Sequence, residues 1–258
     1  MTVDNVISFD TINVSRSFHL ENDTAQPSCN LEISYIYPVS CFDEAKLDTL
    51  QQIFLGLFLD KNYEGLMPDE AFDAYAKNYI DNYKEDARIF YKEKVYEISE
   101  DASVDTYFSY YESLSNKILF NKSDLLSLQT IQTNSKGGQN SYKQVYSYVL
   151  NLETGELLSE DDIFQPGYER VLNLIFKDRL MNKNGVKTIH DLEDLGYFGI
   201  DEMMPNGNFY IDDKAVTYVF NKNEYSVLQL DEIVIPISYI DITDILKKKS
   251  PISVFFEE

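Results

Sequence analysis

The chain has 258 residues, and 22 Lys and Arg residues against 44 Asp and Glu residues give it a formal net charge of −22 at pH 7. This length allows one large domain or two small ones with a substantial core. A field this negative repels nucleic acid and anionic membrane surfaces, which excludes both as expected partners, and it attracts cations and basic proteins. The simpler interpretation is that the acidic surface keeps the protein soluble.

The sequence contains no apolar run long enough to cross a bilayer, and its N-terminus lacks a charged segment followed by an apolar leader. We expect a soluble chain, and an exported domain whose signal or lipid anchor was removed fits equally well. Cys29 and Cys41 flank a predicted strand at residues 31–39. An extended strand of this length separates them well beyond disulfide reach. We therefore predict free, buried thiols.

The first hundred residues predict two strands followed by two helices. Residues 11–20 and 31–39 alternate apolar and polar side chains, which is typical of antiparallel strands with one face buried. A capping box is predicted at Ser40 to Asp43, before a helix that ends near residue 60. A second helix opens at Met67-Pro68, because proline is tolerated in the first helical turn.

From residue 95 onward the pattern becomes two-fold again for about fifty residues. The expected strands lie at residues 104–114, 117–120, 124–133 and 142–152. Short polar turns join them, which predicts an antiparallel meander. We place a boundary near residues 96–103, so that 1–98 and 99–258 form two parts or one continuous domain.

Residues 142–164 are predicted to lead from the meander of strands into the helices that follow it. Its strand pattern ends at a tight turn in which Gly155 takes positive φ. Ser159 and Asp162 then form a predicted capping box for a short helix. Further helices are predicted at residues 168–181, 189–195 and 238–246, with strands at 208–211, 215–220 and 232–236. The whole pattern predicts an α+β fold of antiparallel meander sheets with packed helices.

The residues that carry most enzymatic chemistry are scarce. The two histidines, His19 and His190, have no partner at metal-ligand spacing, and no nucleophile motif or phosphate-binding loop is present. We therefore predict no catalytic residues, no metal site and no cofactor. Pairs of carboxylates are common, but in so acidic a chain they arise by chance, so they are weak evidence for a glycan hydrolase.

Three segments carry a family resemblance. They are Gly137-Gly138 leading to YVLNLETGE at 148–156, LSEDDIF at 158–164, and the strand residues from 208 to 237. Together they resemble bacterial exported domains such as the sensor of a lysozyme-responsive anti-sigma factor (RsiV-like) and the non-catalytic N-terminal part of a peptidoglycan deacetylase (PdaC-like). The family has Ala-His-Gly after the two glycines, whereas this chain has Gln139-Asn140-Ser141, so the role of that histidine does not carry over.

The resemblance implies an α+β fold, export to the bacterial periplasm or cell surface, and anchoring by a lipid or helix outside this sequence. Our first hypothesis is a non-catalytic binding or sensor module of the cell envelope for a cationic protein such as lysozyme or for a peptidoglycan fragment. The predicted contact is the loop Lys136, Gly137, Gly138, Gln139, Asn140 and Ser141. A plain hairpin tip explains the same glycines. The alternatives are a carboxylate-based glycan hydrolase and a structural envelope lipoprotein.

Overall fold

The computed structural model describes residues 3–94, 107–137 and 141–256. The chain folds into two compact units. We call Ile7–Asn116 with Thr130–Lys143 the N-terminal unit, and Met1–Val6, Lys117–Gln129 and Gln144–Glu258 the C-terminal unit. The boundary predicted at residues 96–103 lies outside the described residues.

The fold is α+β, as predicted. A six-stranded sheet has its strands in sequence order, and a second sheet has the order β7-β8-β9. The strands are β1 (Ile7–His19), β2 (Ser28–Cys41), β3 (Tyr110–Lys122), β4 (Leu125–Lys136), β5 (Tyr142–Asn151), β6 (Glu156–Leu157), β7 (Phe209–Ile211), β8 (Ala215–Phe220) and β9 (Ile233–Ser238). The neighbours β3, β4 and β5 follow one another as expected for a meander, and β7-β8-β9 is antiparallel throughout.

Two details of the larger sheet differ from the sequence prediction. Strands β2 and β3 pair in parallel. Parallel neighbours need a long crossover connection, and the connection between these two contains α1 (Leu47–Phe58) and α2 (Pro68–Lys94). Strand β3 is also continuous where two strands were predicted. The polar step that resembled a turn contains Asn116, which is buried and bonds with both the N–H and the C=O of Ile36 on β2.

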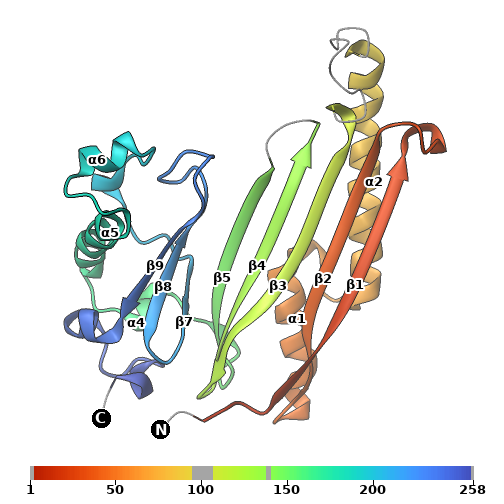
Figure 1. The fold of residues 1–258 in the computed structure, drawn as a ribbon. Coiled ribbons are helices and arrows are strands. Elements are labelled where there is room, and N and C mark those ends of the chain that lie inside the picture. Colours follow the sequence, from red (N-terminus) through yellow and green to blue (C-terminus); the bar gives the residue numbers. More distant parts are fainter. Residues whose placement is uncertain (1–2, 95–106, 138–140, 257–258) are drawn as a thin grey trace. The chain divides into compact units, whose positions relative to one another are not determined.

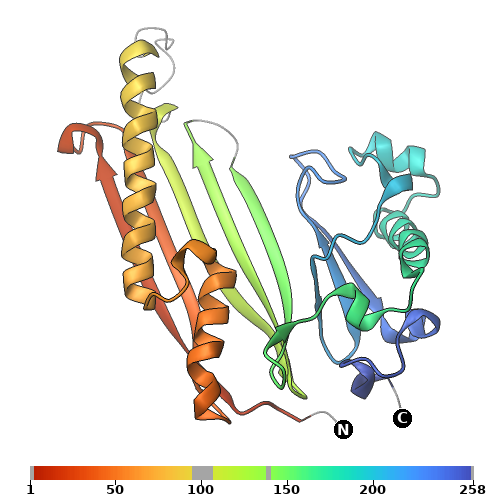
Figure 2. The same cartoon turned by 180° about the vertical axis from the view of Figure 1, so that it is seen from behind.

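Helices α1 and α2 cover one face of the sheet in the N-terminal unit (Figures 1 and 2). The ring of Tyr35 on β2 lies 4.8 Å from that of Phe58 and 5.3 Å from that of Phe72. The capping box predicted at Ser40 is wrong. Ser40 is still in β2, and the side chain of Asp43 instead caps a 3-10 turn before α1 by accepting from the N–H of Ala45.

The C-terminal unit contains α4 (Glu160–Ile163), α5 (Tyr168–Asn184) and α6 (Ile189–Asp194). The capping box of α4 is confirmed, since the Ser159 N–H donates to Asp162 at 2.8 Å. In the core, the ring of Phe176 packs within 5.0 Å of Tyr218 and 5.2 Å of Phe220. The last predicted helix is a 3-10 helix, Tyr239–Ile245.

Other 3-10 helices lie at Leu20–Asn22, Glu44–Lys46, Lys61–Tyr63, Ile200–Glu202 and Ser253–Phe255. Within the described ranges, none of the helices combines the length and the apolar character that a membrane crossing requires.

The two thiols are free, as predicted, and lie near opposite ends of β2. Cys29 is buried as predicted, but Cys41 is only half-buried, so the prediction of a buried thiol is wrong for Cys41. Burial raises the pKa of Cys29 from 9.0 to about 11. At pH 8 its thiolate fraction is then about 100-fold lower in the native chain than in the unfolded chain.

We expect iodoacetamide to label Cys41 first and Cys29 at least about 100-fold more slowly in the native protein than in urea. Peptide mass spectrometry at timed intervals measures both rates in one sample, and a Cys41→Ser variant isolates Cys29. Equal labelling of the two thiols in the native protein would contradict this placement of Cys29.

Candidate functional site

The loop predicted to bind a ligand begins where β4 ends. The Lys136 ammonium lies 5.4 Å from the centre of the Tyr110 ring. Gly137 has φ +60°, donates its N–H to the Ser109 carbonyl at 3.1 Å, and leaves no room for a Cβ, which would clash with the Tyr107 carbonyl oxygen. The close approach therefore requires glycine at this position.

The rest of this loop is only partly described. Ser141 is exposed, and Gly138, Gln139 and Asn140 lie outside the described residues. The binding role of the loop therefore stays a prediction.

The sequence analysis missed a buried carboxyl on which the charge of Lys136 acts. Glu112 on β3 is 8% exposed and accepts a hydrogen bond from the Tyr75 hydroxyl on α2. Burial raises the pKa of Glu112, against the opposing influences of Tyr75, Gln132 and Lys136. The available signal was its position in β3. Glu112 shares the side that faces the helices with Tyr110 and Leu114, because residues two apart in a strand point the same way.

The chemistry around Glu112 favours a structural role. Burial raises the pKa of Tyr75 and of its neighbour Tyr79, so both phenols stay protonated and act as hydrogen-bond donors. Tyr79 donates to the Asn30 carbonyl of β2 at 3.3 Å. These contacts hold α2 against β2 and β3 and keep the Glu112 carboxyl away from water.

The carboxylates with lowered pKa have local structural partners. Hydrogen bonds from Ser159 and Thr188 lower the pKa of Asp162 and of Asp191 in the capping boxes of α4 and α6. On α2, hydrogen bonds from Lys77 and Lys84 lower the pKa of Asp81. Two glycosidase carboxyls would instead need to be tuned against each other across one cleft.

Metal ligands do not gather in the described part of the chain, where no group of three or more His, Cys, Asp or Glu side chains could hold a metal ion.

In the C-terminal unit, two asparagines tie β5 to the smaller sheet. Asn221 accepts from the N–H of Val145 at 2.7 Å and donates to its C=O at 3.1 Å. Asn208 donates to the same carbonyl at 2.8 Å and accepts from the N–H of Ser147 at 2.7 Å. The side-chain amides thus take the place of a neighbouring strand along β5, and we call the pair the asparagine clamp.

Glu160 makes a second connection inside this unit. Its carboxylate accepts from the Tyr168 hydroxyl at 3.2 Å and from the N–H of Gly207 at 3.0 Å. The LSEDDIF segment therefore fixes both the start of α5 and the loop before β7. Of its acidic residues, Asp162 caps α4 and Glu160 connects α5 with the loop before β7.

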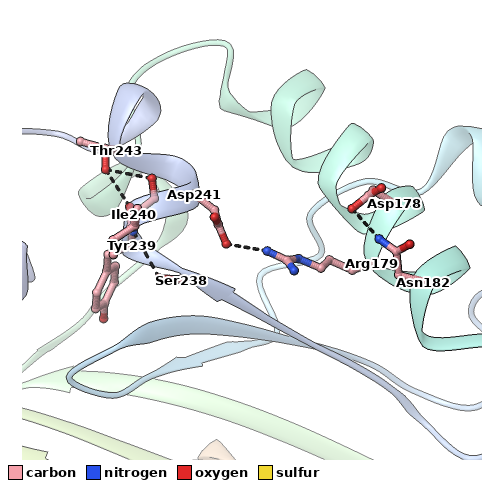
Figure 3. A network of polar contacts seen from close by, with 8 residues as sticks. All are labelled: Asp178, Arg179, Asn182, Ser238, Tyr239, Ile240, Asp241 and Thr243. Carbon is pink, nitrogen blue, oxygen red and sulfur yellow. Dashed lines mark hydrogen bonds and ion pairs between the residues drawn. The ribbon is translucent and has the colours of Figure 1, made fainter.

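Figure 3 shows the polar network that connects α5 with the 3-10 helix after β9. Arg179 and Asp241 form an ion pair at 2.5 Å, and the neighbouring Asn182 donates to Asp178 at 2.9 Å. Both members of the ion pair are more than 40% exposed. Solvent screening therefore limits such a pair to about 0–1 kcal/mol of stability.

Two loops of the C-terminal unit carry exposed apolar side chains. Leu195, Phe198, Val227 and Leu228 are between 38% and 47% exposed, and we call them the α6 loop surface. The two loops are held together because the Phe198 N–H donates to the Tyr225 carbonyl at 3.0 Å and the Val227 N–H to the Gly196 carbonyl at 2.9 Å.

Exposed carboxylates lie on the same segments as the α6 loop surface. Glu193, Asp194 and Glu224 are exposed on the same segments, and Asp231, which lies 3.5 Å from Lys222, is 96% exposed. Exposed apolar side chains with carboxylates on the same segments are suited to a partner that carries apolar and basic groups. The sequence signal was Leu195 at the end of a predicted helix with Phe198 just after it, and Val227-Leu228 in a predicted loop.

Comparison with known proteins finds a family model that matches part of the C-terminal unit. Residues 161–228 match the sequence model of the family described as "Protein of unknown function (DUF3298)". A search of curated proteins finds no match. The crystal structure of a DUF3298 family member from Bacteroides fragilis NCTC 9343 superposes with a TM-score of 0.89 at 26% identity, covering 99% of this chain and 100% of that one.

A DUF3298 family protein from Pseudomonas aeruginosa PAO1 has a TM-score of 0.62 at 13% identity, covering 95% of this chain and 96% of that one, and shows a shared fold. The finer resemblance to RsiV-like and PdaC-like proteins stays a prediction. The chain thus carries the DUF3298 sequence pattern at residues 161–228 and is similar to a solved DUF3298 protein over nearly its whole length.

Proposed function

We propose that this chain is an exported, non-catalytic binding module of the bacterial cell envelope whose partner is a basic protein such as lysozyme. The observation that supports it best is the α6 loop surface, where exposed apolar side chains lie among exposed carboxylates. The net charge of −22 adds long-range attraction for a basic partner. The resemblance to exported envelope domains supports the location.

The structural roles of the shifted carboxyls favour this proposal over the hydrolase alternative. Asp162 and Asp191 cap helices, and Glu112 is buried against α2. A hydrolase would release reducing sugar from peptidoglycan, and a purely structural lipoprotein would bind neither lysozyme nor cell-wall fragments. Incubation of the chain with purified sacculi, followed by a reducing-end assay, separates the hydrolase from the other two.

We expect hen egg-white lysozyme to bind the full chain, with the dissociation constant rising at least about tenfold between 50 and 300 mM NaCl because salt screens the attraction. Replacing Phe198 by Ala should weaken binding about tenfold, since it removes a central apolar contact. Isothermal titration calorimetry at both salt concentrations measures this.

Leu174→Ala is the matched control, because Leu174 is 58% exposed on α5 and lies outside the α6 loop surface. Equal weakening by both substitutions would argue against this surface as the binding site. Absence of salt-sensitive binding to lysozyme would count against the proposed partner itself.

A further inference from the structure

We propose that the open face of β1, β2 and β3 in the N-terminal unit binds a neutral, unbranched polysaccharide chain. On β2, the buried residues Leu31, Ile33 and Tyr35 face α1 and α2. The residues between them face the other way, where no helix of this unit lies in the described ranges (Figure 1). This proposal uses a different surface and a different ligand from the proposed function.

Strand register arranges the side chains of this open face in rows. Ser15, Glu32 and Ser113 form the middle row, because Ser15 pairs with Glu32 and Glu32 with Ser113. Ser17, Asn30 and Tyr111 form the row on one side.

The third row is Asn13, Ser34 and Ser115, and we call these three rows the polar face. None of its residues is buried. Neighbours are about 4.8 Å apart across the strands and about 6.6–7 Å apart along them.

The polar face is almost free of charge in a chain of which 26% is charged. Glu32 is its one charged residue, and that carboxylate already accepts a hydrogen bond from Tyr111 at 2.9 Å. Arg16 of β1 lies on the opposite side, paired with Asp73 of α2 at 2.8 Å. A solvated face of so acidic a protein ordinarily carries both signs of charge. This one instead presents hydroxyls and amides, which match a ligand without charge.

The polar face is also ordered before any ligand arrives. Ser17 donates to the Asn30 side-chain oxygen at 2.8 Å, and Asn30 donates to the Ser28 hydroxyl at 3.1 Å. Serine hydroxyls are short, so they lose little side-chain entropy when a ligand binds. The fixed strand geometry therefore holds donors and acceptors at a regular spacing without further cost.

A polysaccharide is the ligand that uses such an arrangement. Its hydroxyls repeat along a chain, as the serines repeat along and across the strands, and both partners donate and accept. Tyr111 is 37% exposed and offers a ring face for stacking on a sugar. Strand faces of other small β-structures bind oligosaccharides in this way. The near absence of charge favours neutral sugars over acidic polymers.

The test is titration of the full chain with chitohexaose and with cellohexaose, followed by calorimetry and by amide chemical-shift mapping. We expect binding of at least one hexasaccharide, with the largest shifts in β1, β2 and β3. Tyr111→Ala should weaken that binding at least about tenfold, and Tyr111→Phe, which keeps the ring, by less. Unchanged thermal unfolding of each variant verifies the fold.

Tyr142→Ala is the matched control, since Tyr142 is also 37% exposed but lies on β5, outside the polar face. Equal weakening by Tyr111→Ala and Tyr142→Ala, shifts confined to other strands, or no binding of either hexasaccharide would each overturn the proposal. Because lysozyme binding is assigned to the α6 loop surface, Tyr111→Ala should leave it unchanged, so the two proposals can fail separately.

Discussion

Replacement of Asn221 by Ala is expected to lower the free energy of unfolding by about 3 kcal/mol. The substitution removes two hydrogen bonds to Val145, which is 4% exposed. The Val145 carbonyl keeps its bond from Asn208 at 2.8 Å, but the Val145 N–H is left without its acceptor in a site that water does not reach. Leaving this buried donor unpaired costs about 1–3 kcal/mol, and the lost bond to the carbonyl adds about 1 kcal/mol.

The asparagine clamp predicts a coupling as well. Asn208→Ala alone leaves the Val145 carbonyl bonded to Asn221, whereas the double substitution removes both of its donors. The double variant should therefore lose about 1 kcal/mol more than the sum of the single losses. Urea unfolding followed by circular dichroism measures all four proteins.

Asn182→Ala is the control for the clamp. Asn182 is exposed on α5 and donates only to Asp178 among the contacts in Figure 3, so its loss should change stability by less than about 0.5 kcal/mol. A loss for Asn221→Ala as small as this one would show that the clamp does not hold β5 to the smaller sheet.

Glu112→Gln is expected to stabilise the chain at pH 7 relative to the wild type, and to do so less at pH 4. Burial raises the pKa of Glu112 above its ordinary value of 4.5, so the native state holds this proton more tightly than the unfolded state. The contribution of Glu112 to wild-type stability then falls as pH rises from about 4.5 through the native pKa. Glutamine has no such dependence and can still accept from Tyr75.

The advantage of the Gln variant should therefore grow as the pH rises from 4 to 7. Urea unfolding at several pH values gives the two curves. Glu32→Gln on the exposed face of β2 is the control for removing one negative charge from a chain of net charge −22. If Glu112→Gln and Glu32→Gln gave parallel curves, Glu112 would not be the buried titrating group.

Much of the secondary structure could be predicted from the sequence. The alternation in β1 and β2, the apolar positions of α1, and the capping box of Ser159 and Asp162 depend on neighbours within a few residues. The hairpin of β7 and β8 followed from a short polar turn between two alternating segments. These features are local, so the order of residues already contains the information.

The candidate sites were harder to predict, because each depends on contacts between distant segments. Glu112 becomes buried only when Tyr75 of α2 lies over it. Asn208 was predicted at the start of a strand and Asn221 lies just after another, and neither shows a special role until Val145 is placed between them. In the loop that was predicted to bind a ligand, Gly137 is required because the backbone of Tyr107 approaches it closely.

By itself, the sequence determined the α+β class, the approximate positions of most strands and helices, and the acidic charge, since periodicity, capping and composition act over short distances. Only the tertiary structure decided that β2 and β3 pair in parallel, which residues form the polar face, and where the apolar α6 loop surface lies. The physical reason is that strand pairing and burial bring together residues some eighty positions apart, as in Leu31 beside Glu112, and no local pattern records those partners.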